Sequence, residues 1–369
     1  MFELSGMGDQ IHAIKIIGVG GHGCRSVQHI EEKRIEHADL LYINSGMLPS
    51  YNSPYFDKTI QNHVLLNEGE LFDDDDLVSA LFMNAEMVII IGDMGDFYAA
   101  HLCCELAQIS RGMKILVATI ARMPLPIEGE ARVTFANKEK DLLGKYTDVI
   151  IPITIENISC NKRHHISFHE INRATDRAIF SAVKGVTYLF SRCGLINIGF
   201  SEVANVLSSM GDAVFATASA QVGGCVRGLV SSAFEYIQYQ INDLNDLQGV
   251  LVIVAASEMP DINDYNAVCD IVQRNVSRNS TVLVNVIYDN LDGYMNVTIV
   301  AGRSECLACQ DSAQNMLGDS SKDDLAGLPG SNNRLRDIQT LVAGSLQCTD
   351  FLDVPVFLRK ASINKIKIL

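Results

Sequence analysis

The chain has 369 residues, of which 48% are hydrophobic and 20% charged, and its formal net charge is −15. This composition allows a large buried core and excludes a globally disordered protein. An acidic surface repels a nucleic acid duplex or an anionic bilayer, so neither is expected as a partner. No apolar run reaches the ~20 residues that cross a bilayer, and the opening residues, MFELSGMGDQ, lack a signal-peptide pattern. The sequence therefore predicts a cytoplasmic protein without direct membrane insertion.

Short β-branched runs alternate with helical patterns along the first two-thirds of the chain. Buried strands are predicted at residues 11–20, 39–44, 87–92, 114–120 and 148–153, and helices at Cys24–Arg34 and Tyr98–Gln108. Strands that are apolar on both faces and joined by helices indicate a parallel, doubly wound α/β sheet. Ligands of such sheets bind at the carboxyl ends of the strands.

A long helix is predicted at Ile171–Phe190, followed by a glycine-containing loop and a helix at Ser201–Met210. A smaller α/β unit follows, with strands at residues 212–220, 249–257, 280–288 and 294–302. We therefore predict a Rossmann-like domain at 1–190 that includes the long helix, and a second α/β domain at 191–302. The composition then shifts to Ser, Asp, Asn and Gly, which predicts a flexible linker at 303–346 before a C-terminal segment at 347–369.

A glycine-rich turn, GVGGHGCR (Gly18–Arg25), lies between the first strand and the first helix. Glycines at such a turn let backbone amides approach a phosphate, and the helix N-terminus favours the anion. Alone the turn is a weak signal, because similar turns serve many nucleotides. It is neither a P-loop nor a GxGxxG motif followed by a ribose-binding acid.

Together with four later motifs, this turn resembles the FtsZ family of tubulin-like cell division GTPases. The other matching segments, in the family's order, are INS (Ile43–Ser45), PLPIEGEAR (Pro124–Arg132), RCGLINIGFSEV (Arg192–Val203) and DFLDVPVFLRK (Asp350–Lys360). The resemblance leaves only the linker unmatched. It implies two domains around a central helix, head-to-tail filaments, GTP with Mg²⁺ at each subunit interface, and a C-terminal peptide that docks on the membrane adaptors FtsA and ZipA.

The resemblance also implies the residues of each site. The nucleotide-contacting positions are Gly20, Gly21, His22, Gly23, Cys24, Arg25, Asn44, Gly92, Met94, Gly95, Asp96, Glu128, Arg132 and Asp176. In the catalytic loop, residues 192–203, Asn197 and Glu202 match the family. The adaptor-binding positions are Phe351, Leu352, Asp353, Val354, Pro355, Phe357, Leu358, Arg359 and Lys360.

The segment GDMGDFY (Gly92–Tyr98) departs from the family's Gly-Gly-Gly-Thr-Gly-Thr-Gly and brings Asp93 and Asp96 to a turn that should hold phosphates. At an effective dielectric of ~20, two like charges ~4 Å apart repel by roughly 4 kcal/mol. Weakened binding of GTP or GDP is therefore expected, and Mg²⁺ only where GTP is bound. The alternative is an ordinary strand–helix turn with Asp96 as the N-cap.

Other positions depart from the pattern in the same direction. His22 replaces a glycine, Arg25 an asparagine, and the third phosphate loop is replaced by ELFDDDDL at residues 70–77. In the catalytic loop Gly199 stands where the first aspartate is expected. Because losing one of two acting carboxylates costs orders of magnitude in rate, we expect GTP hydrolysis that is slow or absent.

Two residue groups have a metal-binding alternative. Cys306 and Cys309 form a CxxC without the second pair that a structural zinc site needs. His164, His165 and His169 lie in a polar insert, where a solvated loop is expected. No metal site is predicted.

Three functions remain open. The favoured one is a division-site FtsZ paralogue that assembles, or co-assembles with a catalytically competent FtsZ, and docks on adaptors while GTP binding and hydrolysis are weakened or lost. The second is an authentic divergent FtsZ that slowly hydrolyses GTP in the Z ring, with Glu202 as the surviving acid. The third is an adaptor-binding regulator that does not polymerise.

Overall fold

The computed structural model describes residues 14–35, 38–44, 63–65, 78, 81–154, 168–191, 198–221, 226–241, 244–257, 262–288 and 294–303. Ten strands in these ranges form one sheet in the order β3-β2-β1-β4-β5-β6-β7-β10-β8-β9. The first six strands, all parallel, are β1 (Ile14–Val19), β2 (Ala38–Asn44), β3 (His63–Leu65), β4 (Met87–Asp93), β5 (Leu116–Arg122) and β6 (Val149–Ile153). Every residue of β1 and β4 is buried, as a sheet covered on both faces requires.

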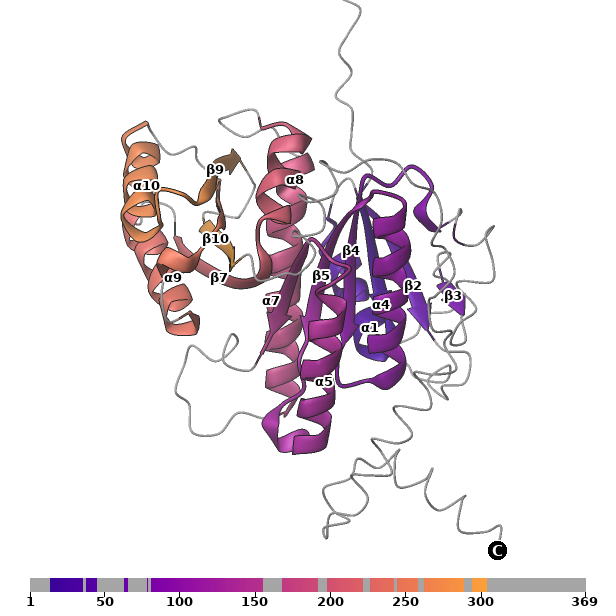
Figure 1. Ribbon diagram of the computed structural model, residues 1–369. Coiled ribbons are helices and arrows are strands. Elements are labelled where there is room, and N and C mark those ends of the chain that lie inside the picture. Colours follow the sequence, from indigo (N-terminus) through magenta and orange to yellow (C-terminus); the bar gives the residue numbers. More distant parts are fainter. Residues whose placement is uncertain are drawn as a thin grey trace, which may run out of the picture.

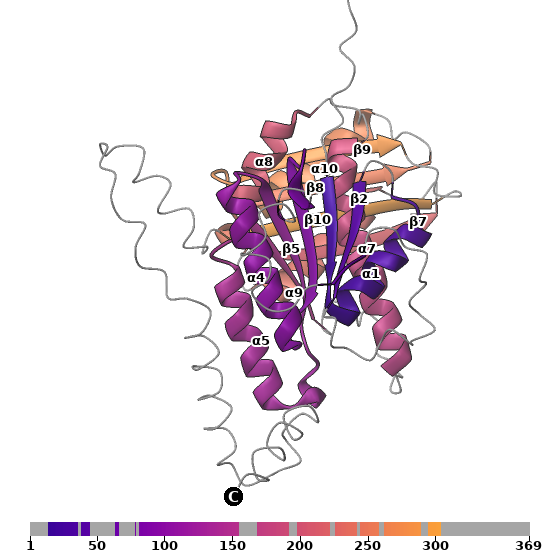
Figure 2. The same cartoon turned by 90° about the vertical axis from the view of Figure 1, so that its right-hand side faces the viewer.

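Helices cover both faces of this parallel part of the sheet (Figure 2). The helices are α1 (Gly20–Glu32), α4 (Phe97–Gly112), α5 (Glu130–Leu143) and α7 (Phe168–Ser191). One apolar cluster joins α1 and α7 to the sheet, and a second joins α4 and α5 to the opposite face. The predicted doubly wound α/β fold is confirmed. The first helix begins at Gly20 and not at Cys24 as predicted, because the glycines themselves form its first turn.

The remaining strands are β7 (Gly211–Gln221), β8 (Gly249–Ala256), β9 (Thr281–Tyr288) and β10 (Tyr294–Arg303). The sequence predicts each of these four strands within two residues of its bounds. β10 lies between β7 and β8 and is antiparallel to both, while β6 and β7 pair in parallel. α9 (Val226–Gln240) and α10 (Ile262–Asn275) cover the outer face of this unit (Figure 1). α8 (Phe200–Ser208) and α7 pack against its inner face. Short 3₁₀ turns lie at η2 (Pro126–Glu128) and η3 (Leu244–Asp246).

Several predicted features lie outside the described residues: Ser45, residues 70–77, His164, His165, Asn197, Cys306, Cys309, residues 304–346 of the linker and the adaptor-binding segment. His169 is described, and it is exposed in the first turn of α7. None of the described helices combines the length and apolar content that a bilayer-spanning helix needs. Within the described part of the chain, no three His, Cys, Asp or Glu side chains gather as metal ligands would.

Candidate nucleotide site

Four parallel strands end at one edge of the sheet, and this edge gathers most of the predicted nucleotide-contacting residues. Val19 at the end of β1 is in register with Ile43 of β2 and with Gly92 of β4. Asp93 at the end of β4 is in register with Arg122 at the end of β5. The turns that leave these strands are therefore neighbours, in the position where such sheets bind ligands.

The glycine-rich turn after β1 is packed tightly against β4. Gly20 has a φ of 72°, a conformation that side chains with a Cβ rarely adopt. A Cβ on Gly23 would lie 2.3 Å from the carbonyl oxygen of Ile91, whereas a Cβ on Gly21 would meet nothing within 4 Å. Cys24 is buried, and its Sγ lies within hydrogen-bond reach of the Gly18 and Ile43 carbonyls. Helix packing therefore explains Gly20 and Gly23 without any ligand.

Gly23→Ala and Gly21→Ala form a matched pair that tests this packing. Overpacking against a fixed backbone costs about 1–3 kcal/mol, so we expect Gly23→Ala to lower the free energy of unfolding by that amount. Gly21→Ala should leave it unchanged or raise it slightly, because alanine favours a helix over glycine. Urea unfolding followed by circular dichroism measures both. Equal free energies of unfolding for the two variants would contradict the tight packing described for Gly23 and the open space described for Gly21.

The turn between β4 and α4 satisfies its own backbone amides. Asp96 is the N-cap of α4, and its Oδ1 accepts from the N–H groups of Tyr98 and Ala99 at 3.0 and 3.3 Å. Met94 donates its N–H to the Arg122 carbonyl, and Asp96 donates to the Asp93 carbonyl. The N-cap that the alternative interpretation predicts at Asp96 is therefore confirmed. In this arrangement Asp96 takes two of the amides that a phosphate at this helix N-terminus would need.

Asp93 is the centre of the site. Its side chain is only 4% exposed, and its Oδ2 lies 2.9 Å from Nδ1 of His22, 3.0 Å from Arg122 and 3.8 Å from Arg132. Its other oxygen accepts the N–H of Gly95 at 2.9 Å. Burial raises the pKa of Asp93, but the hydrogen bond from His22, the charge of Arg122 and the Gly95 N–H together hold that pKa below its ordinary value. The Asp93 carboxylate therefore already pairs with the cationic side chains that lie around this turn.

This environment predicts a pH-dependent contribution to stability. A lowered carboxyl pKa stabilises the folded state above the ordinary value of about 3.9, and that contribution disappears as pH falls through the lowered pKa. We therefore expect wild type to exceed Asp93→Asn in free energy of unfolding at pH 7, and the difference to shrink below about pH 4. Denaturant titrations at several pH values measure it. Asp39→Asn, at an exposed position of β2, is the control. Its difference from wild type in free energy of unfolding should not shrink in this way as the pH falls.

Glu128 and Arg132, two of the expected nucleotide-contacting positions, lie in the segment Pro124–Arg132. Nη1 of Arg132 is 3.1 Å from Glu128, whose Oε1 accepts the N–H of Leu125. A Cβ on Gly95 would lie 2.5 Å from Nε of Arg132, so this arginine covers the β4–α4 turn directly. The segment Pro124–Arg132 and the β4–α4 turn therefore form one connected cluster.

Asp176, one of the expected nucleotide-contacting positions, is also paired within the chain. Asp176 on α7 lies 3.4 Å from Nε of Arg25, and it accepts from the Ser26 hydroxyl at 3.2 Å. Arg122 donates through Nη2 to Asn172 at 3.0 Å, which ties α7 to the Asp93 cluster. Sequence reasoning missed Arg122 as a site residue. The sequence contains one clue to this role, because Arg122 ends the apolar run of β5 as Asp93 ends that of β4.

The described part of the predicted catalytic loop is a helix cap. Gly199 is the N-cap of α8, and its N–H donates to Oε2 of Glu202 at 3.0 Å. Glu202 is exposed, so its carboxylate is held at its own helix start on the surface. Phe200 packs on Phe190 of α7, with ring centroids 5.2 Å apart.

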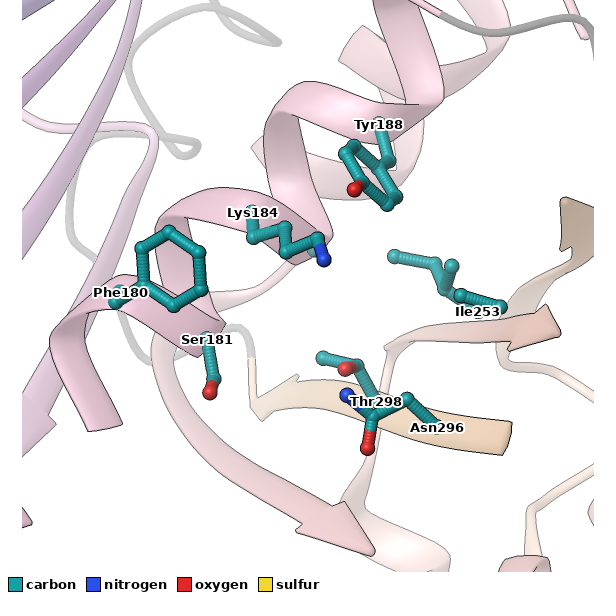
Figure 3. Close-up of a pocket in the computed structure, with 9 residues that line it drawn as sticks. Phe180, Ser181, Lys184, Tyr188, Ile253, Asn296 and Thr298 are labelled. Carbon is teal, nitrogen blue, oxygen red and sulfur yellow. The ribbon is translucent and has the colours of Figure 1, made fainter. Parts of the chain in front are cut away.

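A separate small cavity lies between α7 and the strands β8 and β10 (Figure 3). Its volume is about 50 Å³, which is room for a few water molecules. Lys184 extends into it from α7, with Nζ 4.9 Å from the centre of the Tyr188 ring. This cavity is lined by none of the predicted nucleotide-contacting residues.

The fold places the chain in a known structural class. It is similar to a mutant FtsZ of M. jannaschii, with a TM-score of 0.71 and 19% identity over 80% of this chain and 92% of that chain. It is also similar to CetZ2 from Haloferax volcanii, with a TM-score of 0.59 and 16% identity over 82% of this chain and 99% of that chain. The class is the tubulin-like fold of FtsZ and CetZ proteins.

The sequence comparisons narrow the class. No family model matches the chain. The cell division protein FtsZ of Wigglesworthia glossinidia brevipalpis is 25% identical over 370 residues, which cover 94% of this chain and 96% of that protein. FtsZ of Pseudomonas aeruginosa is 26% identical over 313 residues, which cover 82% of this chain and 79% of that protein. By sequence the chain is therefore similar to FtsZ proteins, at 25–26% identity over most of its length.

Proposed function

We propose that the chain is a division-site FtsZ paralogue in which a carboxylate of the chain itself pairs with the cationic side chains of the nucleotide site. We propose that it modulates filaments of a catalytically competent FtsZ. One observation carries the proposal: the buried Asp93 carboxylate holds His22, Arg122 and Arg132 where the family pattern requires a phosphate-binding turn. A triphosphate entering this site would displace that carboxylate from its partners. The same charge that stabilises the fold therefore opposes the ligand.

The residues of the turn do not fit a triphosphate in this arrangement. A glycine signature at this turn would leave its backbone amides free for phosphates. Here the N–H groups of Gly95, Tyr98 and Ala99 donate to the carboxylates of Asp93 and Asp96. At an effective dielectric of ~20, each close carboxylate–phosphate contact costs roughly 4 kcal/mol. We infer weak binding of GTP or GDP, with Mg²⁺ present only alongside a bound triphosphate.

Slow or absent hydrolysis follows from the catalytic loop. Gly199 supplies no carboxylate, and Glu202 is held by the amide of Gly199. In a head-to-tail filament this surface would face the nucleotide of the neighbouring subunit, where the family pattern supplies two acids. A chain of this kind would join a filament and remain there, because turnover would not drive its release.

Attachment to the membrane adaptors FtsA and ZipA is the second part of the proposal. The segment Phe351–Lys360 is largely apolar and ends in two basic residues, a pattern of groove-binding peptides. Many such segments along one filament would turn weak docking into firm attachment. This arrangement would place the chain in the cytoplasm at the division septum.

Co-sedimentation with an active FtsZ tests the proposal. We expect the chain to pellet with GTP-assembled FtsZ at a fixed ratio and to lower the GTP turnover of the mixture. Phe351→Asp with Leu358→Asp should abolish binding to an adaptor and leave co-sedimentation unchanged. A chain that binds the adaptor but never enters the pellet would support the non-polymerising regulator instead.

The authentic, slowly hydrolysing FtsZ remains the second candidate, because two arginines of the site are incompletely paired. Nη2 of Arg25 and Nε of Arg132 are buried and have no hydrogen-bond partner within the described residues. An anionic ligand would satisfy both groups. Retention of guanine nucleotide through purification, together with measurable turnover, would favour this candidate.

A further inference from the structure

The last strand of the sheet has an edge that no described segment covers. Among the described strands, β9 pairs only with β8, in parallel, from Gly249↔Thr281 to Ala256↔Tyr288. Thr281 donates its N–H toward β8, to the carbonyl of Gln248. Because the hydrogen bonds of a strand alternate in direction, the amides of Val282, Val284 and Val286 point away from β8. These groups are a template for one more strand.

The sequence of β9 lacks the devices that normally protect such an edge. Edge strands are usually short or carry charges, prolines or bulges. β9 is eight residues long, TVLVNVIY, with no charged residue and no proline, and its pairing with β8 is regular throughout. Val282 is 39% exposed. A long, uncharged, apolar edge of this kind is expected to be covered in the folded protein.

The end of the chain has the pattern of a strand that would cover it. The last seven residues read INKIKIL, with Ile366 and Ile368 alternating with Lys365 and Lys367 and with no proline or glycine. Period-two alternation of apolar and polar residues is typical of a strand with one buried face. Residues 359–369 hold four basic residues and no acidic one, in a chain of net charge −15. The segment is therefore also complementary in charge to the body of the protein.

We propose that residues 363–369 of the same chain add to β9 as an eleventh strand. In the added strand, Ile366 and Ile368 would extend the apolar face that carries Val282 and Val284, and the lysines would face the other side. Main-chain hydrogen bonds to the outward amides would supply the pairing, as in other cases of strand addition.

The connection is long enough for this pairing within one molecule. The added strand would lie three strand spacings from β10, which is ~14 Å. The intervening segment, residues 304–362, has 59 residues, and a random coil of that length spans ~40 Å. The effective concentration of a segment tethered in this way reaches the millimolar range, which favours the segment of the same chain over a second molecule. The adaptor-binding segment would then be anchored at both ends.

Hydrogen exchange of the β9 amides tests the proposal on the full-length chain. We expect the amides of Val282, Val284 and Val286 to exchange at least tenfold faster after Ile366→Pro with Ile368→Pro, because proline cannot join a ladder. Ser331→Pro with Asn333→Pro places the same pair of prolines in the linker and should leave exchange unchanged. The synthetic peptide ASINKIKIL, added at millimolar concentration to the Ile366→Pro, Ile368→Pro variant, should restore slow exchange.

Three outcomes would overturn the inference. Equal exchange in wild type and both proline variants would mean that the chain end does not cover β9. Protection that rises with protein concentration and survives the tail substitutions would mean that a second copy covers the edge. Protection that is lost with Val354→Asp and Val356→Asp, but not with the tail prolines, would assign the edge to the adaptor-binding segment. Thermal unfolding of each variant confirms that the sheet itself remains folded.

Discussion

Replacing Arg122 by methionine should lower the free energy of unfolding by about 3–5 kcal/mol, because it removes one of the two closest cationic partners of a buried carboxylate. Arg122 lies 3.0 Å from Asp93 and 3.0 Å from Asn172, so one substitution disconnects β4 from α7. His22 and Arg132 remain, but Arg132 is 3.8 Å away and already engaged by Glu128. Guanidinium chloride unfolding at pH 7 measures the loss.

Two further variants show whether the lost stability comes from the interaction between Arg122 and Asp93. Arg173→Met removes an exposed arginine from α7 and should change stability by less than about 1 kcal/mol. Arg122→Met combined with Asp93→Leu should recover much of the loss, because an apolar pair can replace a buried ion pair with little cost. A double variant that is as unstable as the sum of its single variants would show that Arg122 and Asp93 are not coupled.

Much of the fold follows from the sequence alone, because its strands are apolar on both faces and bounded by turns. For this reason the sequence predicts β1, β4, β5 and β6 within a few residues of their bounds. It misses β3, because three residues carry no periodic signal. The helices α9 and α10 are expected only as part of a smaller α/β unit, since their apolar positions are interleaved with polar ones. The sheet order, with β10 between β7 and β8, depends on long-range strand pairing that local patterns do not encode.

The candidate site is predictable in part. The motifs locate the turns, and the aspartates at 93 and 96 stand out as unsuited to phosphate. What the sequence does not contain is the direction of each side chain. Pairing of Asp93 with Arg122 depends on the parallel register of β4 and β5, and pairing of Asp176 with Arg25 depends on how α7 packs on α1. Both are tertiary contacts between segments that are distant in the chain.

The largest functional effect is expected from restoring the family pattern. Asp93→Gly, Asp96→Gly and Gly199→Asp together should raise GTP turnover by at least ~10²-fold over wild type, because they free the phosphate turn and return the missing acid. Turnover is measured as phosphate release at several protein concentrations, since the proposed head-to-tail assembly places this acid against the nucleotide of the neighbouring subunit. Circular dichroism must first show that the triple variant is folded, because Asp93 also pairs with His22, Arg122 and Arg132.

Partial restorations separate the two defects. Gly199→Asp alone should leave turnover near the wild-type level, because the phosphate turn remains filled. Asp93→Gly with Asp96→Gly should restore binding without turnover. If wild type already turns over GTP as fast as the triple variant, the interpretation of both loops is wrong.

The Asp93 and Asp96 carboxylates of this chain pair with the amides and cationic side chains that a nucleotide would need. Equilibrium titration of the purified, nucleotide-free wild type with GTP and Mg²⁺ tests the effect of this pairing most directly, beside Asp93→Gly with Asp96→Gly. A repulsion of roughly 4 kcal/mol corresponds to about a thousandfold in affinity, so the double variant should bind about that much more tightly than wild type. Equal and tight binding of GTP by the two proteins would contradict the account.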